Sequence, residues 1–175
     1  MKSITTLSQL LVALEMCSES EYKSVVHQMR IPKQEFTDYM HWSSERYTRN
    51  CIVRNDSYEL ILLCWEPGQE TPIHCHNEQE CWVYLVDGSM SEKQYDFQKN
   101  KCPEAREYFE LDDHDHSYMN DTIGLHSLHN NSGKRVMTLH LYAKPIDKCS
   151  YFNPETGAFE TVELSYHSYL QKWAV

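Results

Sequence analysis

From Tyr47 onward the chain is a succession of short segments rich in β-branched and aromatic residues, many of which alternate between apolar and polar. Turn-forming pairs separate them, including Asn-Asp at 55–56, Pro-Gly at 67–68 and Asp-Gly at 87–88. Many short strands at this spacing predict a mainly β fold, either a β-barrel or a double-sheet jelly roll. The expected strands lie in the segments 47–55, 58–66, 81–88, 91–97, 106–113, 135–143 and 158–168.

The first forty residues have a different pattern and predict helices. Segment 5–17 is amphipathic, with leucines at helical spacing that form one apolar face. Segment 18–29 opens with the Ser-x-x-Glu arrangement of a capping box. Segment 32–40 begins with Pro32, which suits the first position of a helix. The leucines of the first apolar face are Leu7, Leu10, Leu11 and Leu14.

No linker, repeat or low-complexity run interrupts the sequence. We therefore expect a single domain over 1–175, with a helical N-terminal part over 1–45 and a β-barrel over 46–170. The formal net charge is −10 and no basic patch stands out, which argues against nucleic acid and against anionic membranes as partners. No stretch approaches the ~18 apolar residues that a membrane span requires. We expect a monomer.

The cysteine pattern indicates a reducing compartment. Seven cysteines occur, an odd number without a Cys-x-x-Cys pair, and no secretion signal precedes them. They predict free thiols in a cytoplasmic protein, most of them packed as small apolar side chains.

His74 and His76 are the strongest candidates for metal ligands. In an extended segment, residues two apart face the same side, so both imidazoles would point into one space and Cys75 would face away. The surrounding pattern, Gly68-x5-His-x-His-x4-Cys-x6-Gly88, resembles the first sequence motif of the cupin barrels. That motif usually has a glutamate ligand at the position held here by Cys81.

Two alternatives for the remaining ligands stay open. Glu80 lies one residue before Cys81 and would complete an ordinary two-histidine, one-glutamate set. Alternatively, the third ligand is His126, because His126-x3-Asn130 resembles the end of the second cupin motif. The pair at 114 and 116 in LDDHDHSYMND is a rival that we interpret as solvated loop histidines. The other histidines without partner spacing are expected to be structural: His27, His41, His129 and His167.

Three histidines without a carboxylate would favour an anionic sulfur ligand, because neutral imidazoles leave the full charge of a divalent metal uncompensated. Further motifs then make the chain resemble, from about residue 47 to 167, the cysteine dioxygenases of the cupin superfamily. The motifs are RYTRN (46–50), LCW (63–65), IHCH (73–76), Cys81, IGLH (123–126) and LHLY (139–142).

The resemblance implies a function and a metal. His74, His76 and His126 would hold iron(II), and L-cysteine and dioxygen would be the substrates. Both oxygen atoms would be added to the thiol sulfur, giving cysteine sulfinic acid. Related possibilities are a dioxygenase for 3-mercaptopropionate or cysteamine, and a cupin that binds a metal or a thiol without turnover.

The resemblance also assigns roles to residues around the metal. In some members a cysteine at the position of Cys81 forms a thioether with a tyrosine that corresponds to Tyr142. Thr138, His140 and Tyr142 would form a catalytic relay of hydroxyl, imidazole and phenol on one face of a strand. The family usually has serine where this chain has Thr138.

Substrate recognition is assigned by the same resemblance. Arg49 would bind the carboxylate of L-cysteine through a two-pronged interaction, and Tyr47 would add a hydroxyl. Relatives that oxidise 3-mercaptopropionate commonly have glutamine at the position of Arg49, so arginine favours L-cysteine. Cysteamine has no carboxylate for Arg49 to bind.

Overall fold

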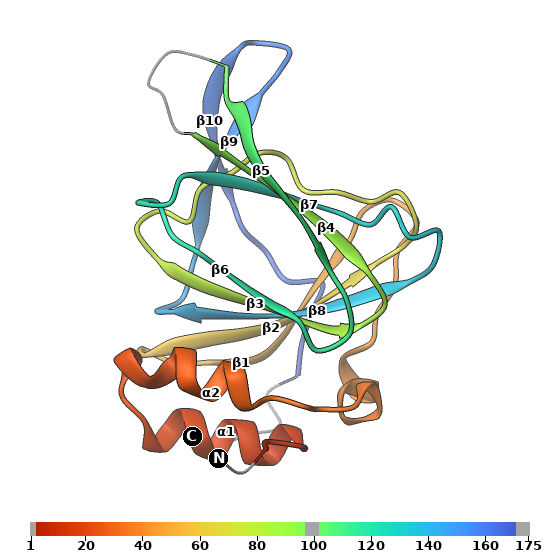
Figure 1. The fold of residues 1–175 in the computed structure, drawn as a ribbon, viewed down its shortest axis with the longest axis vertical. Coiled ribbons are helices and arrows are strands. Elements are labelled where there is room, and N and C mark those ends of the chain that lie inside the picture. Colours follow the sequence, from red (N-terminus) through yellow and green to blue (C-terminus); the bar gives the residue numbers. More distant parts are fainter. Residues whose placement is uncertain (1–2, 97–101, 171–175) are drawn as a thin grey trace.

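The computed structural model describes residues 3–96 and 102–170, which form a β-barrel with helices at one end (Figure 1). A six-stranded sheet, in the order β11-β1-β2-β8-β3-β6, faces a three-stranded sheet, β5-β4-β7. A hairpin of β9 and β10 stands at the end away from the helices. The strands are β1 Thr48–Arg54, β2 Tyr58–Trp65, β3 Glu80–Asp87, β4 Met90–Asp96, β5 Glu104–Leu111, β6 His116–Met119, β7 Leu125–His129, β8 Val136–Ala143, β9 Lys148–Asn153, β10 Ala158–Glu163 and β11 Ser168–Tyr169.

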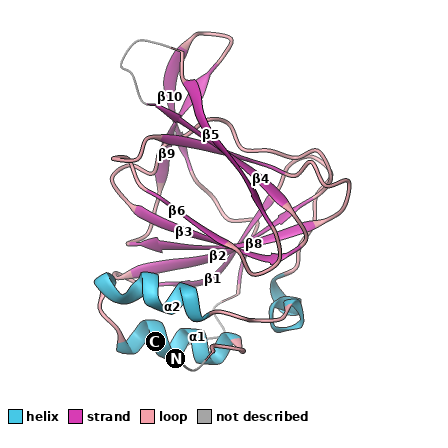
Figure 2. Cartoon of the chain, in the orientation of Figure 1, coloured by secondary structure: helices cyan, strands magenta, loops and turns pink. Residues whose placement is uncertain are grey.

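The helices form as their sequences predict and all lie at one side of the barrel (Figure 2). Helix α1 spans Leu7–Met16, buries the four leucines expected from their spacing, and is capped by Thr6. A short 3₁₀ turn, Glu19–Glu21, leads into α2, Tyr22–Gln28, and the Ser18–Glu21 capping box is formed. The third predicted helix is a 3₁₀ helix, Lys33–Tyr39, that begins one residue after Pro32.

Strands β2 and β8 lie in the middle of the larger sheet and are buried along their whole length. One face of this sheet packs against the N-terminal helices, and the other face lines the barrel interior. Because successive residues of a strand point to opposite faces, both rows of side chains must be largely apolar. This explains why YELILLCW and VMTLHLYA read as almost continuous apolar runs.

The structure contains strands that the sequence pattern did not predict, namely β6, β7 and β9. The segment predicted as one strand over 158–168 is divided into β10 and β11, which belong to different sheets. The interpretation of residues 114 and 116 as solvated loop histidines holds only in part: His114 lies in the turn between β5 and β6, but neither side chain is fully exposed. Both are half-buried: the Tyr84 hydroxyl lies 2.6 Å from Nδ1 of His114, and His116 begins β6 and packs against His27.

Across the described ranges 3–96 and 102–170, no helix is long and apolar enough to cross a membrane. Phe97, the last residue of the strand predicted over 91–97, lies outside the described residues.

Gly124 is required where β7 approaches β4. Its φ is +134°, and a Cβ built there would lie 2.3 Å from the carbonyl oxygen of Tyr95. We therefore expect Gly124→Ala to lower the free energy of unfolding by about 2–5 kcal/mol, because backbone strain and overpacking add. Gly133→Ala is the matched control: its φ is +72° and nothing lies within 4 Å of the added Cβ. It should cost only about 1–2 kcal/mol. Urea unfolding of both variants measures the difference, and equal losses would show that the contact with Tyr95 is unimportant.

Candidate metal centre and substrate cavity

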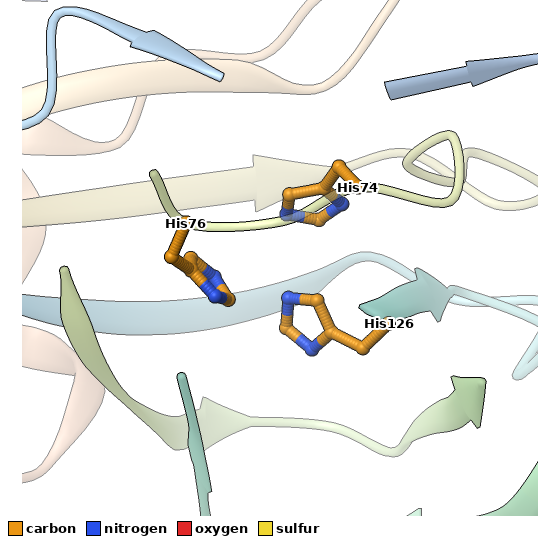
Figure 3. Close-up of side chains that lie close together, drawn as sticks. All are labelled: His74, His76 and His126. Atoms are coloured by element: carbon orange, nitrogen blue, oxygen red, sulfur yellow. The ribbon is translucent and has the colours of Figure 1, made fainter. Parts of the chain in front are cut away.

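His74, His76 and His126 converge in the barrel interior (Figure 3). Their ring nitrogens include one atom from each residue that all lie within 4.8 Å of one another. His74 and His76 come from an extended segment between β2 and β3, and His126 comes from β7. Two backbone hydrogen bonds join His74 and His126, of 3.0 Å from His74 N–H and 3.1 Å from His126 N–H. The third histidine is thus placed by strand-like pairing with the first.

Burial keeps His74 and His76 neutral, and hydrogen bonds support the rings of His74 and His126, as metal ligands require. Desolvation is the main cause that lowers the pKa of His74 to about 3 and holds the pKa of His76 well below its usual value. Nδ1 of His126 bonds a carboxylate oxygen of Glu92 at 2.9 Å, and Nδ1 of His74 bonds the carbonyl oxygen of Pro72 at 3.0 Å. These contacts orient the rings and leave Nε2 of both histidines directed elsewhere.

Neither ring nitrogen of the buried His76 has a hydrogen-bond partner among the residues that the structure describes. A buried imidazole without partners is costly unless a ligand satisfies it. The set of three imidazoles therefore fits a divalent transition metal such as zinc, copper or iron.

The loop that carries His76 is held by Asp121. Its carboxylate accepts hydrogen bonds from the backbone N–H groups of His76, at 2.7 Å, and Glu78, at 2.8 Å. Asn77 and Glu78 both have positive φ, of 50° and 67°. Such backbone is strained for residues other than glycine, so the Asp121 carboxylate stabilises the turn that follows the second histidine.

Glu80, the alternative ligand, does not join the metal cluster of the described residues. Its carboxylate accepts a hydrogen bond of 2.8 Å from the Tyr118 hydroxyl. The pair at 114 and 116 also lies outside that cluster.

Cys81 and Tyr142 stand directly opposite each other in the antiparallel pairing of β3 with β8. Directly opposed residues project to the same face, with their Cβ atoms about 4.5–5.5 Å apart. Both side chains are buried in the inner apolar cluster, and burial raises the pKa of the thiol and the pKa of the phenol. The thiol and phenol are therefore both protonated at neutral pH.

Thr138 and His140 occupy the next inward positions along β8. The Thr138 hydroxyl lies 2.9 Å from Nε2 of His140, and Nδ1 of His140 lies 4.0 Å from the Cys81 sulfur. The rings of His140 and Tyr142 are stacked, with centroids 6.2 Å apart. The three residues expected to form a relay thus lie in one row, and Trp65, to which the sequence assigned no chemistry, donates a hydrogen bond of 2.9 Å to Thr138.

Arg49 lies on β1 at the wall of the site. It pairs with Leu63, which pairs in turn with Thr138, so the three residues form one row across the sheet. Arg49 and Tyr47 line a cavity of about 300 Å³ whose other wall is formed by residues 162–165 and 167. The positive charge of Arg49 helps to lower the pKa of His74, so the two side chains lie close enough to interact electrostatically.

Nε and Nη2 of Arg49 are buried and have no hydrogen-bond partner within the described part of the chain. An unpaired buried guanidinium is unfavourable unless an anion binds it. The arrangement can therefore bind a small carboxylate beside a metal.

Sequence reasoning missed Glu92, Asp121 and the hydrogen bond from Trp65. Glu92 and Asp121 have no motif spacing relative to the histidines, because they reach them from other elements. Trp65 belongs to the same buried cluster as Cys81 and Tyr142.

Comparisons with known proteins agree with this site. The sequence profile of a family described as cysteine dioxygenase type I matches residues 2–155. Cysteine dioxygenase type 1 of Rattus norvegicus is 32% identical over 152 residues, covering 85% of this chain and 76% of that protein. The Homo sapiens protein of the same name is 31% identical over 169 residues, covering 94% and 84%.

Solved structures support the fold. A Klebsiella pneumoniae protein with a double-stranded β-helix domain superposes with a TM-score of 0.51 at 16% identity, over 73% of this chain and 93% of that one. A protein from Thermus thermophilus gives a TM-score of 0.53 at 16% identity, over 63% and 95%. The predicted cupin-type β-barrel after N-terminal helices is confirmed. With the profile match and the curated relatives, the chain belongs to the cysteine dioxygenase type I family of oxidoreductases.

Proposed function

We propose that the protein binds iron(II) through His74, His76 and His126 and oxidises L-cysteine with dioxygen to cysteine sulfinic acid. The reaction is balanced without another reductant: sulfur loses four electrons, dioxygen gains four, and both oxygen atoms end on sulfur. The observation that carries this proposal is that Nε and Nη2 of Arg49 are buried without a hydrogen-bond partner among the described residues, while the charge of Arg49 acts on His74 of the three-histidine cluster.

Iron(II) is the metal whose chemistry fits the family and the donor set. When bound, it would supply the redox chemistry that joins a thiolate to dioxygen. The protein contributes three neutral donors and no carboxylate, so an anionic sulfur balances the charge of the site. Glu92 and the carbonyl oxygen of Pro72 hold two of the donors in position.

Arg49 and Tyr47 are the proposed substrate-binding residues. Nε and Nη2 of Arg49, which have no partner within the ranges 3–96 and 102–170, form the fork that can bind a carboxylate in two places. Tyr47 lines the same cavity, and its ring stacks on Trp65 with centroids 4.5 Å apart. Binding by Arg49 would favour a thiol that carries a carboxylate over cysteamine, because cysteamine would leave the buried guanidinium nitrogens unpaired.

Tyr142, His140 and Thr138 are the proposed catalytic group. The Tyr142 phenol is buried and keeps its proton, because burial holds its pKa well above the ordinary value. It can therefore donate a hydrogen bond to a negatively charged oxygen or carboxylate in the site. The ring of His140 stacks on that of Tyr142, and His140 is itself hydrogen-bonded to Thr138 on the same strand.

A thioether between Cys81 and Tyr142 is proposed from their opposed positions on β3 and β8. Forming the bond replaces the S–H and one ring C–H, and releases two electrons and two protons. Dioxygen, the co-substrate, would accept the two electrons and two protons and leave as hydrogen peroxide. The link would remove rotamer freedom from the phenol and preorganise its hydroxyl.

The protein is further proposed to act as a monomer in the cytoplasm. The seven cysteines are all free, which suits a reducing compartment.

Substitution of Arg49 tests its proposed role in binding the substrate carboxylate. Arg49→Gln should raise KM for L-cysteine by about 10–100-fold, because a charge-assisted two-pronged interaction is lost. Arg46→Gln removes the same charge from an exposed residue of the same cavity and should change KM less than about twofold. Oxygen uptake is measured with L-cysteine, 3-mercaptopropionate and cysteamine, and sulfinate is assayed in parallel. Equal uptake with all three thiols would contradict the role of Arg49, and no uptake would contradict the proposed reaction.

The second prediction concerns the metal. Glu92→Gln should weaken iron(II) binding by about 10–100-fold, because a neutral amide supports the His126 ring less well than a carboxylate. Glu80→Gln is the control and should leave the affinity unchanged, since Glu80 bonds Tyr118. Anaerobic titration with a competing chelator measures both. A larger loss in Glu80→Gln would instead assign that carboxylate to the metal.

The third prediction concerns the thioether. After incubation with iron(II), L-cysteine and air, intact-mass spectrometry should show a loss of two hydrogens in the wild-type chain. Cys81→Ser and Tyr142→Phe should not lose them, whereas Cys149→Ser should behave as the wild type does. Loss of the two hydrogens in Cys81→Ser would exclude the proposed pair.

A further inference from the structure

Trp65 extends the row of polar groups on β8 at the end away from Tyr142. The indole is fully buried, and its Nε1–H donates a hydrogen bond of 2.9 Å to the Thr138 hydroxyl. Trp65 pairs with Val136 in the ladder between β2 and β8, so it reaches Thr138 diagonally across the two strands. The same indole stacks on Tyr47.

The donor and acceptor properties of these groups favour one direction of hydrogen bonding along the row. An indole N–H can only donate, whereas a threonine hydroxyl has one hydrogen and accepts through its lone pairs. Because Thr138 accepts from Trp65, its own hydrogen is free to be donated to the other close neighbour, Nε2 of His140, at 2.9 Å. If Nε2 carried a hydrogen instead, the Thr138 hydroxyl would accept twice and its own buried hydrogen would have no acceptor among the described residues, so an Nε2 without a hydrogen is favoured.

His140 is neutral, so its single ring hydrogen is left for the other nitrogen. The side chain is buried, and desolvation, chiefly, holds its pKa well below the usual value. Nδ1–H therefore faces the Cys81 sulfur, 4.0 Å away. In the proposed thioether this sulfur has no hydrogen and can only accept, so an Nδ1–H donor suits it.

We propose that Trp65 is a positioning residue that holds His140 in the Nδ1–H tautomer, so that the imidazole presents a donor to the pair formed by Cys81 and Tyr142. A hydroxyl that accepts a hydrogen bond becomes a stronger donor, so the indole N–H favours donation from Thr138 to Nε2; without it this bias is lost and His140 would adopt both tautomers. The consequence for catalysis rests on the proposed function, whereas the tautomer does not.

The tautomer can be measured directly. In the full chain loaded with zinc(II), which is diamagnetic, ¹⁵N NMR distinguishes protonated from unprotonated imidazole nitrogens. Signals of His140 are assigned by their absence from the His140→Gln spectrum. The wild type should show Nδ1 protonated and Nε2 unprotonated. A protonated Nε2, or a mixture of tautomers, in the wild type would overturn the proposal, whether or not the protein oxidises L-cysteine.

Two variants separate the direction of hydrogen bonding from simple packing. Trp65→Phe keeps an aromatic ring beside Tyr47 but removes the N–H, and should give a mixture of His140 tautomers. Thr138→Val removes the bridging hydroxyl at nearly the same shape and should also lose the single tautomer, which keeps the proposal testable if Trp65→Phe does not fold. Thr138→Ser retains the hydroxyl and should behave as the wild type does. A single, unchanged tautomer in both Trp65→Phe and Thr138→Val would overturn the role of the indole.

Steady-state kinetics supply the functional readout. Trp65→Phe should lower kcat for L-cysteine roughly tenfold, in the range expected when a hydrogen bond that supports active-site groups is lost. KM should change less than about twofold, because Arg49 is untouched. A rise in KM with kcat unchanged would show that the indole acts only through Tyr47 and would overturn the proposed role in the relay.

Discussion

The reciprocal backbone hydrogen bonds between His74 and His126 are the contact on which the site depends. They join the extended segment after β2 to β7 of the smaller sheet, and so fix two ligands relative to each other without relying on their side chains. His76 follows two residues later and faces the same side, because the segment is extended. Asp121 then holds the turn beyond it. The three imidazole rings come together because these backbone contacts fix the positions of the residues that carry them.

The second constraint is the burial of β2 and β8 on both faces. A polar residue on the inner face of such a strand must find a partner there, because water is excluded. Thr138 and His140 are hydrogen-bonded to each other, and the Thr138 hydroxyl also accepts a hydrogen bond from the indole of Trp65. The barrel interior is therefore rigid around the phenol of Tyr142, and its polar groups have few alternative arrangements.

Arg49 differs from these residues, since its buried donors Nε and Nη2 are left unpaired among the described residues, as are the ring nitrogens of His76. A protein that keeps such a group loses stability unless something binds it. In the proposed function, the carboxylate of L-cysteine would provide the missing partner, and the cost of burying these donors would become a source of specificity.

Much of the site could be predicted from the sequence because its members lie at short, regular spacings. His74 and His76 are two apart, and Thr138, His140 and Tyr142 form an alternating row on one strand. His126, Arg49 and the pairing of Cys81 with Tyr142 came from motifs that resemble a known family. Glu92 and Asp121 could not be found in this way, because each meets its histidine only where separate elements come together.

The sequence by itself determined the alternation and the turns, and with them the β-barrel, the helical N-terminal part and the rows of inward-facing polar residues. These depend on local rules of strand and helix geometry. Only the tertiary structure decided between Glu80 and the three-histidine cluster, and it placed the half-buried histidines at 114 and 116 outside that cluster. The reason is that strand register and the pairing of distant segments determine which side chains share a space, and neither is set by residue spacing along the chain.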